Sequence, residues 1–301
     1  MMITSIKDLI KAAKNIPKKT LVVAVANDEA VLGSVEKARQ ENIVDAILVG
    51  DGAAIKDVLN KLNYEAKHYT IIDEADPALA CEKAVRLVSE NDGYFLMKGL
   101  VDTKTILKAA LDKTYGLRTE NRLSHLSVIA AKNYHKFMIM SDGGMNIQPN
   151  VDEKQEIIEN AAKIARALGI EKPNVGIIAA VEKVNPKMQA TLDAQTLVER
   201  QRNGEIKDVI IDGPFAIDNA INQEAARHKG ITSPMAGDVD ILLMPAIEAG
   251  NVFYKTLMFL ADAKSASVIA GAKKPIVLTS RADSEESKFY SIALSALVAN
   301  L

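Results

Sequence analysis

The sequence predicts an α/β fold with two domains, each built on a largely parallel sheet. Three observations lead to this prediction. Short apolar runs, typical of strands buried on both faces, alternate with longer stretches whose apolar residues recur at helical spacing. Gly, Pro and Asp, which suit turns from strand to helix, follow many of these runs. The length of 301 residues suits about two domains.

The first third of the chain repeats a strand–helix unit after an opening helix. The apolar face of the opening helix would carry Ile6, Leu9, Ile10 and Ala13. The expected strands cover residues 20–26, 45–49, 68–72 and 94–97. The helices that follow them are expected to begin near Asp28, around Ile55, at Asp76 with Pro77, and at Asp102. An Asp at such a start accepts hydrogen bonds from backbone N–H groups, and Pro fits the first helical turn.

Two extended runs in the middle of the chain, at residues 124–131 and 136–140, lie only a few residues apart. This spacing predicts a hairpin or a crossing between domains, so we place a domain boundary near residue 133. Further strands are expected at residues 175–180, 208–211, 239–244, 267–270 and 275–279. Further helices are expected at residues 151–168, from Pro186 to about residue 202, and at residues 250–263 and 284–299.

Composition and charge argue against several classes of protein. Lys and Arg number 37 and Asp and Glu number 39, so the net charge of −2 gives no global field for nucleic acid. The longest apolar runs, such as residues 21–26, are too short to span a bilayer. The N-terminus has the pattern of an amphipathic helix without a signal-peptide core. We therefore expect a cytoplasmic protein without nucleic-acid or membrane partners.

The metal-binding residue types show no metal-site pattern. Cys81 is the single cysteine, which excludes an intrachain disulfide and a cysteine-based zinc site, and it lies on the apolar face of an expected helix. The four histidines lack metal-ligand spacing, and His125 falls in an expected strand, where a packed imidazole is the ordinary interpretation. We expect no metal.

The ends of the expected strands are the places to look for chemistry, because ligands of open parallel sheets bind outside the carboxyl ends of the strands. Five such ends are unusual: Lys98-Gly99, Ser141-Asp142-Gly143-Gly144, Asp212-Gly213-Pro214, Pro245 through Gly250-Asn251, and Ser280-Arg281. Gly permits close approach of the backbone to a ligand. Each end can also be explained by turn chemistry alone, since turns from strand to helix use the same residues.

Ser280-Arg281 is the most informative of these ends, because it precedes the last expected helix. A helix N-terminus offers unpaired N–H groups to an anion, and the planar guanidinium of Arg matches a phosphate. The alternative is an Arg on a surface loop.

Three nearby polar residues leave their roles open. Asp283 and Glu286 could take a proton from an attacking thiol, or they could cap the last helix as a pair. Lys98 could contact phosphate or could be a solvated loop residue.

Four motifs resemble those of the phosphotransacylase family: SDGGMNIQP (141–149), DGPFAIDNAI (212–221), DVDILLMPAIEAGNVFYKTL (238–257) and KPIVLTSRADSEES (274–287). The resemblance extends over nearly the whole chain. Within the family it is greatest to the members that transfer butyryl groups.

The resemblance implies an architecture and a reaction. Family members have two α/β domains of the isocitrate/isopropylmalate dehydrogenase type with a cleft between them, and they form homodimers. On this chain the first domain would comprise residues 1–132 and 271–301, and the second residues 133–270. The reaction is the reversible conversion of acyl-CoA and phosphate to acyl phosphate and CoA, with no metal and no tightly bound cofactor.

The resemblance also implies site residues. Ser280 and Arg281 match the family's Ser-Arg pair, of which the Arg holds the acyl phosphate. The expected substrate-binding residues are Lys98, Gly99, Asp142, Gly143, Gly144, Asn146, Asp212, Gly213, Gly250, Asn251 and Lys255. The acetyl-specific branch has an Asp as general base six residues after the Arg, where this chain has Ser287. Glu286 is therefore our candidate base, with Asp283 nearby.

The chemistry tolerates a weak base. A free alkyl thiol with a pKa of about 8.5 is already a few per cent thiolate at neutral pH. Stabilising charge on the tetrahedral intermediate is the larger contribution, which favours Arg281 over any carboxylate.

Three other functions remain open at this point. The first is a phosphate acetyltransferase of the same family. The second is a metal- and NAD-dependent hydroxy-acid dehydrogenase of the same fold, which would need a cluster of Asp residues that the sequence does not show. The third is a sensor that binds CoA without turnover.

Overall fold

The computed structural model describes residues 2–280 and 283–301, and these form two compact units. Unit 2 comprises Ile6–Asn121 and Ala266–Leu301. Unit 1 comprises Arg122–Ser265 together with the residues before Ile6, and Ile3 donates its backbone N–H to Leu168 of this unit. The expected α/β class with mostly parallel strands is confirmed.

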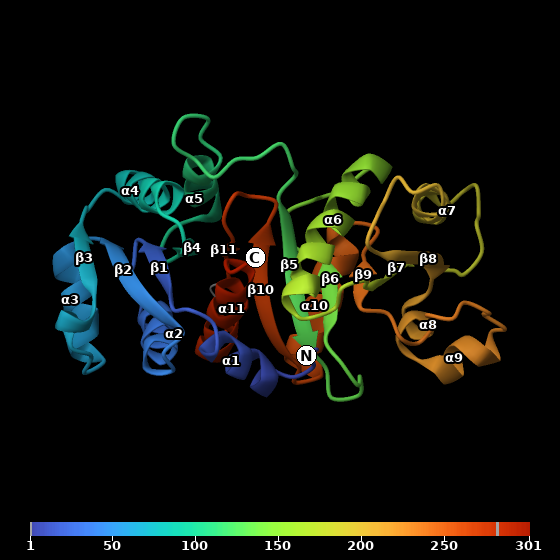
Figure 1. Ribbon diagram of the computed structural model, residues 1–301, viewed down its shortest axis with the longest axis horizontal. Coiled ribbons are helices and arrows are strands. Elements are labelled where there is room, and N and C mark those ends of the chain that lie inside the picture. Colours follow the sequence, from blue (N-terminus) through green and yellow to red (C-terminus); the bar gives the residue numbers. More distant parts are fainter. Residues whose placement is uncertain (1, 281–282) are drawn as a thin grey trace. The chain divides into compact units, whose positions relative to one another are not determined.

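Unit 2 is built on a sheet with the strand order β3-β2-β1-β4-β11-β10 (Figure 1). Its strands are β1 (Lys19–Ala24), β2 (Val44–Gly50), β3 (Thr70–Asp73), β4 (Tyr94–Lys98), β11 (Ile276–Val277) and β10 (Lys264–Ala270). The β10–β11 pair is antiparallel and the other pairs are parallel. The inner strands β1 and β4 are apolar and buried, as a sheet covered on both faces requires.

Helices cover both faces of this sheet. The helices of unit 2 are α1 (Ile6–Lys14), α2 (Glu29–Gln40), α3 (Gly52–Lys61), α4 (Pro77–Glu90), α5 (Thr103–Ala110) and α11 (Glu285–Val298), with a short 3-10 turn, η1 (Ala66–His68). α4 packs with α5, whereas α11 packs between α1 and α2 (Figure 1). Asp28, Asp76 and Asp102 cap their helices through side-chain hydrogen bonds, as predicted.

Unit 1 is built on a sheet with the strand order β5-β6-β9-β7-β8. Its strands are β5 (Ser124–Ala130), β6 (Met138–Ser141), β7 (Asn174–Ile178), β8 (Ile210–Phe215) and β9 (Ile241–Leu243). Its helices are α6 (Val151–Ala167), α7 (Gln189–Arg202), α8 (Ile217–Ile221), α9 (Gln223–His228) and α10 (Ile247–Leu260). β5 and β6 form an antiparallel hairpin, and the remaining pairs are parallel.

The structure corrects several expected elements. β8 continues through Asp212 and Gly213, which were expected to lie in the turn after the strand. α8 and α9 were not predicted, because each is too short to show helical periodicity. α10 begins at Ile247 rather than at residue 250. The units divide after Asn121 and Ser265, whereas the sequence placed domain boundaries after residues 132 and 270. Those domain boundaries stay a prediction.

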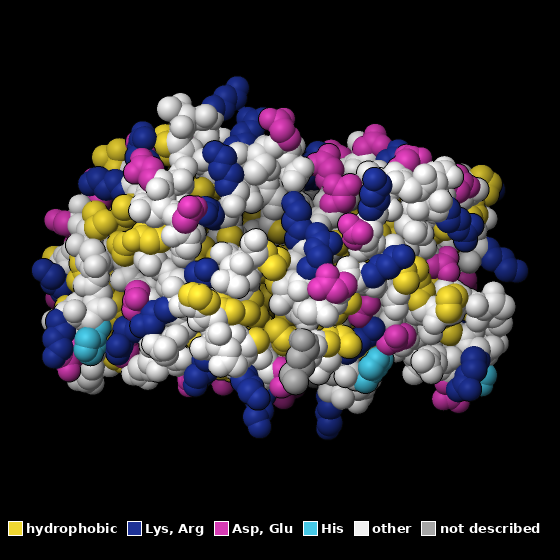
Figure 2. Space-filling model, viewed as in Figure 1, with side chains coloured by type: hydrophobic (Ala, Val, Ile, Leu, Met, Phe, Trp, Pro, Cys, Tyr) yellow, Lys and Arg dark blue, Asp and Glu magenta, His cyan; other side chains and the backbone are white. Residues whose placement is uncertain are grey.

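Among the described residues, no helix is both long and apolar enough to cross a membrane. Figure 2 shows acidic and basic side chains mixed over the face that it presents, which is consistent with the small net charge.

A buried carboxylate ties α2 to the turn before β3. Glu36 is 5% exposed and accepts hydrogen bonds from Arg39 at 2.7 and 2.8 Å, from Gln40 at 2.8 Å and from the Tyr69 hydroxyl at 2.5 Å. Burial alone would raise the pKa of Glu36, but these hydrogen bonds outweigh it and lower the pKa from 4.5 to about 2.

Replacing this carboxylate should destabilise the fold in a pH-dependent way. Because the pKa is depressed in the folded state, the stabilisation is present above about pH 4.5 and is lost as the pH falls towards 2. We expect Glu36→Gln to lower the free energy of unfolding by about 2 kcal/mol at pH 7, with the difference from wild type shrinking below pH 5. Denaturant titrations across pH measure this. The control is Glu41→Gln, whose exposed ion pair with Lys14 should be worth under about 1 kcal/mol. A pH-independent difference would contradict the prediction.

Candidate functional site

The loop after β6 is organised by the carboxylate of Asp142, which is 3% exposed. Its Oδ1 accepts the backbone N–H groups of Gly144 at 2.7 Å and Met145 at 2.8 Å. Its Oδ2 accepts the backbone N–H of His125 at 2.9 Å and the Nδ2 of Asn146 at 2.7 Å. The two oxygens are therefore engaged within the protein, so Asp142 shapes the loop from inside.

Asn146 continues this network. It is buried, and its Nδ2 also donates to the carbonyl of Leu123 at 3.0 Å, while its Oδ1 accepts from Arg122 at 3.2 Å. Asp142 and Asn146 were predicted to bind substrate. The geometry gives them a clear structural task, and their contact with substrate stays a prediction.

The start of α10 lies directly against this loop. A Cβ on Gly250 would lie 2.3 Å from the carbonyl oxygen of Asp142, so only glycine permits the approach. Asn251 donates from Nδ2 to the carbonyl of Gly143 at 3.0 Å. The structure thus brings together Asp142, Gly143, Gly250 and Asn251, which the sequence places about a hundred residues apart.

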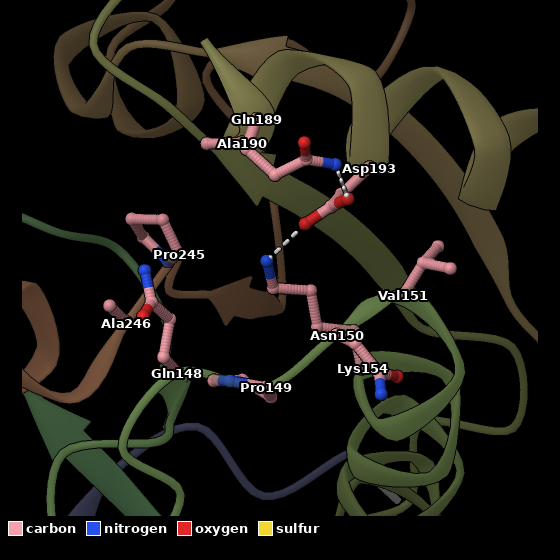
Figure 3. Close-up of a pocket in the computed structure, with 10 residues that line it drawn as sticks. All are labelled: Gln148, Pro149, Asn150, Val151, Lys154, Gln189, Ala190, Asp193, Pro245 and Ala246. Atoms are coloured by element: carbon pink, nitrogen blue, oxygen red, sulfur yellow. Dashed lines mark hydrogen bonds and ion pairs between the residues drawn. The ribbon is translucent and has the colours of Figure 1, made fainter.

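A pocket of about 460 Å³ lies at the same edge of the sheet of unit 1 (Figure 3). Its wall includes Gln148, Pro149 and Asn150 from the loop after β6, and Pro245 and Ala246 from the loop after β9. Three helices, α6, α7 and α10, begin at this wall. Neither α7 nor α10 has a side-chain cap, and helix N-termini of this kind favour anionic groups.

A buried ion pair closes one side of the pocket. Lys154 of α6 donates to Oδ2 of Asp193 of α7 at 2.5 Å, and both side chains are about 5% exposed. Gln189 donates to the other oxygen of Asp193 at 2.8 Å, so the three side chains form a chain along the wall (Figure 3). Sequence reasoning missed these residues, because no motif joins positions on α6 and α7.

Two predicted residues lie elsewhere in unit 1. Gly213, with a φ of +148°, sits inside β8, where a Cβ would lie 2.9 Å from the carbonyl oxygen of Ile177. Close pairing with β7 therefore explains this glycine. Asp212 accepts the N–H of Gly213 at 2.9 Å. β7 and β9 separate both residues from the Asp142 loop within the sheet.

Lys255 lies on the exposed face of α10, where Val252, Phe259 and Leu260 are 65%, 69% and 84% exposed. These four side chains form a mostly apolar helix face, which we call the α10 face.

In unit 2, Lys98 and Gly99 end β4 as predicted. Lys98 is buried, and its Nζ donates to the carbonyls of Gly99 at 3.2 Å and Val101 at 3.0 Å, so it orders this loop. A Cβ on Gly99 would lie 2.2 Å from the carbonyl oxygen of Val25. Close contact with Val25, just after β1, therefore leaves room only for glycine at position 99.

The segment before α11 carries the predicted catalytic residues. Arg281 lies outside the described residues. Ser280 is exposed, and its backbone N–H donates to Oδ2 of Asp283 at 2.7 Å. Lys288 is buried and donates to the carbonyls of Ser280 at 3.3 Å and Asp283 at 2.5 Å. These contacts hold the two ends of the segment around Arg281.

The helix cap differs from the prediction. Ser284, not Asp283, caps α11, and its hydroxyl accepts the N–H of Ser287 at 3.1 Å. The carboxylate of Asp283 instead accepts the backbone N–H of Ser280. The side chain of Glu286 is exposed, and its Oε1 lies 4.0 Å from Nζ of Lys37 of α2. It does not complete a capping box, and its role as a base stays a prediction.

Cys81 is fully buried, and burial raises the pKa of its thiol to about 11. Its interpretation as a core residue is confirmed. Among the described residues, no group of His, Cys, Asp and Glu side chains has the arrangement of a metal site.

Comparison with known proteins places the chain. The model of the phosphate acetyl/butaryl transferase family matches residues 5–82 and 79–296. The chain belongs to this family. It is therefore an acyltransferase, and the resemblance seen in the motifs is confirmed.

Some relatives of the chain are named phosphate butyryltransferase and others phosphate acetyltransferase. The chain is 46% identical to the phosphate butyryltransferase of Clostridium beijerinckii over 97% of both chains. It is also 46% identical to the phosphate acetyltransferase of Thermotoga maritima, over 98% of this chain and 99% of that one. Among solved structures, a branched-chain phosphotransacylase from Enterococcus faecalis matches with a TM-score of 0.83 and 31% identity, over 93% of this chain and 99% of that one.

The contact between Gly250 and the Asp142 loop gives a direct test of this edge. In Gly250→Ala the new methyl group must displace the Asp142 backbone, and a shift of about 1 Å in a site can cost up to about 10²-fold in rate. We expect kcat/KM for acyl transfer to fall at least about tenfold while the circular dichroism spectrum is retained. The control is Gly204→Ala, where nothing lies within 4 Å of the added Cβ. Its φ of +79° means that alanine strains the turn after α7, but this turn lies at the opposite end of α7 from the pocket, so we expect a slight loss of stability and the kcat/KM of the wild type. Wild-type kcat/KM in Gly250→Ala would remove this edge from the site.

Proposed function

We propose that the chain is a phosphate butyryltransferase that transfers butyryl or branched short-chain acyl groups between CoA and inorganic phosphate. The observation that supports this most is the full-length similarity to the Clostridium beijerinckii enzyme. The similarity to a branched-chain phosphotransacylase structure points to the same class of acyl group. CoA and phosphate act as substrates, and no tightly bound cofactor or metal takes part.

In the proposed mechanism, some residues stabilise the charge of the reacting groups and others position the reacting groups. The CoA thiolate attacks the carbonyl of the acyl phosphate, negative charge gathers on the carbonyl oxygen, and phosphate then leaves. Arg281 and backbone N–H groups stabilise this charge, and Ser280 lies beside Arg281 in the sequence. Asp283 accepts the backbone N–H of Ser280, and Lys288 donates to the carbonyls of both residues. Glu286 is the proposed base, in place of the Asp for which this chain has Ser287.

The pocket of unit 1 is proposed to take an anionic part of the substrates. Uncapped helix starts at α7 and α10 favour negative charge there, and the wall contains residues of two of the family motifs, at 148–149 and 245–246.

We also propose a cytoplasmic homodimer. The apolar side chains of the α10 face would form the contact, because exposed side chains as large as Phe259 and Leu260 are typical of protein–protein interfaces, whereas Lys255 stays a predicted substrate-binding residue.

Arg281 should be the most sensitive side chain. Loss of one donor to a developing oxyanion typically costs about 10²–10³ in kcat. We expect Arg281→Ala to lower kcat by this factor. The measurement is the phosphate-dependent release of free CoA thiol from butyryl-CoA. Arg227→Ala, on the short helix α9 and outside the four family motifs of the sequence, is the control and should keep wild-type kcat. Near wild-type kcat in Arg281→Ala would remove this residue from the mechanism.

The acyl group is tested by a substrate series. Each buried methylene is worth about 0.8 kcal/mol, so two extra methylenes should favour butyryl over acetyl by about tenfold or more. We expect kcat/KM, measured with phosphate from acetyl- to hexanoyl-CoA, to peak at butyryl-CoA or a branched thioester.

A peak at acetyl-CoA would instead make the chain a phosphate acetyltransferase, an alternative favoured by the similarity to the Thermotoga maritima enzyme. If the protein bound CoA but transferred no acyl group, it would be a CoA sensor and not an enzyme.

A further inference from the structure

We infer that Asn27, just beyond the end of β1, is a substrate-binding residue whose Oδ1 accepts an N–H group of CoA. The inference rests on the proposed function and adds to it a contact that no motif indicated. Three observations in unit 2 support it.

The first observation is the topology around β1. The chain runs from β1 to β2 and β3 on one side, whereas β4 lies on the other side of β1. The point where the order of strands reverses opens a crevice at the carboxyl ends of the two diverging strands, and ligands of open α/β sheets bind there. In unit 2 the order of strands reverses at β1 and β4, and Asn27 and Gly99 follow the carboxyl ends of these two strands in the chain.

The second observation is the backbone of Val25. Its φ is +58°, a left-handed conformation that is unfavourable for a β-branched residue. Neighbouring groups hold it there: its carbonyl accepts the N–H of Leu100 at 2.7 Å, and Gly99 lies too close to carry a side chain. Such strain is typical of places where a chain must present a group in one direction. Here the strained residue lies two positions before Asn27 and therefore fixes the direction of the chain that leads to it.

The third observation is the side chain of Asn27 itself. Its Oδ1 is buried, and among the described residues it has no hydrogen-bond partner. The cap of α2 does not use it, because Asp28 accepts the N–H of Val31 at 2.8 Å instead. Leaving a buried acceptor unpaired costs about 1–3 kcal/mol, so an N–H group that reaches Oδ1 of Asn27 from a bound ligand would remove this cost.

The chemistry of an amide oxygen defines that partner. It accepts hydrogen bonds and repels phosphate oxygens, so it does not serve the phosphate substrate. CoA offers N–H groups from two sources, the amides of its pantetheine arm and the amino group of its adenine. Both could reach such an acceptor, and the experiment separates them.

The test compares binding with stability. Calorimetry gives the Kd of CoA, pantetheine and adenosine 3′,5′-bisphosphate, and thermal unfolding gives the Tm without ligand. In Asn27→Ala we expect the Kd of CoA to rise about 3- to 10-fold, the value of one neutral hydrogen bond, while the Tm stays equal or rises because an unpaired group is gone. Asn27→Asp keeps an acceptor and should stay within about threefold of the wild-type Kd. The fragment whose Kd rises in Asn27→Ala identifies the source of the N–H.

Asn219→Ala is the matched control. Asn219 is fully buried and its Oδ1 also has no partner among the described residues, but it lies in unit 1 and its Nδ2 donates to Glu182 at 2.6 Å. We expect a lower Tm and an unchanged Kd.

The outcomes separate this inference from the proposed function. An unchanged Kd in Asn27→Ala, a loss as large in Asn27→Asp, or a lower Tm without a change in Kd would each overturn the role of Asn27. Wild-type protein that binds CoA but makes no acyl phosphate would overturn the proposed function and leave the comparison of Kd values valid. Wild-type protein that binds no CoA would overturn both.

Discussion

The buried carboxylate of Asp142 is the interaction on which the candidate site of unit 1 depends. A buried charge is tolerated only when hydrogen bonds replace its water, and four N–H donors from β5 and the loop after β6 do so here. These bonds fix the end of β6, and the missing side chain of Gly250 lets α10 begin against it. Strand end, loop and helix start therefore act as one rigid edge, which borders the pocket.

Three lysines among the described residues are buried, and each makes contacts that order the fold. Lys98 binds carbonyls of its own loop, Lys154 pairs with Asp193, and Lys288 holds the segment before α11. The ammonium groups of Lys98 and Lys288 bind carbonyls that follow β4 and β11, and that of Lys154 joins α6 to α7. In the proposed mechanism the guanidinium of Arg281, with its planar set of donors, meets the transferred group, and the contact of Lys98 with substrate stays a prediction.

The sequence predicted the α/β class, most strands and helices, and the Asp caps of α2, α4 and α5, because buried parallel strands and capped helices leave strong local patterns. It also selected Asp142, Gly143, Gly250 and Asn251 from motifs, and the structure brings them into contact. It placed Asp212 and Gly213 after a strand that in fact includes them, because Gly and Pro read locally as a turn. Lys154, Asp193 and Asn27 were missed, since their importance comes from partners, or the lack of one, in three dimensions.

The central claim is that an acyl group passes between CoA and inorganic phosphate on this protein. Phosphorus NMR of the purified protein with butyryl-CoA and inorganic phosphate observes this transfer directly. We predict that a butyryl phosphate resonance appears at the same rate as free CoA thiol and that neither forms when phosphate is left out. Release of thiol without phosphate, or no resonance of an acyl phosphate, would contradict the account.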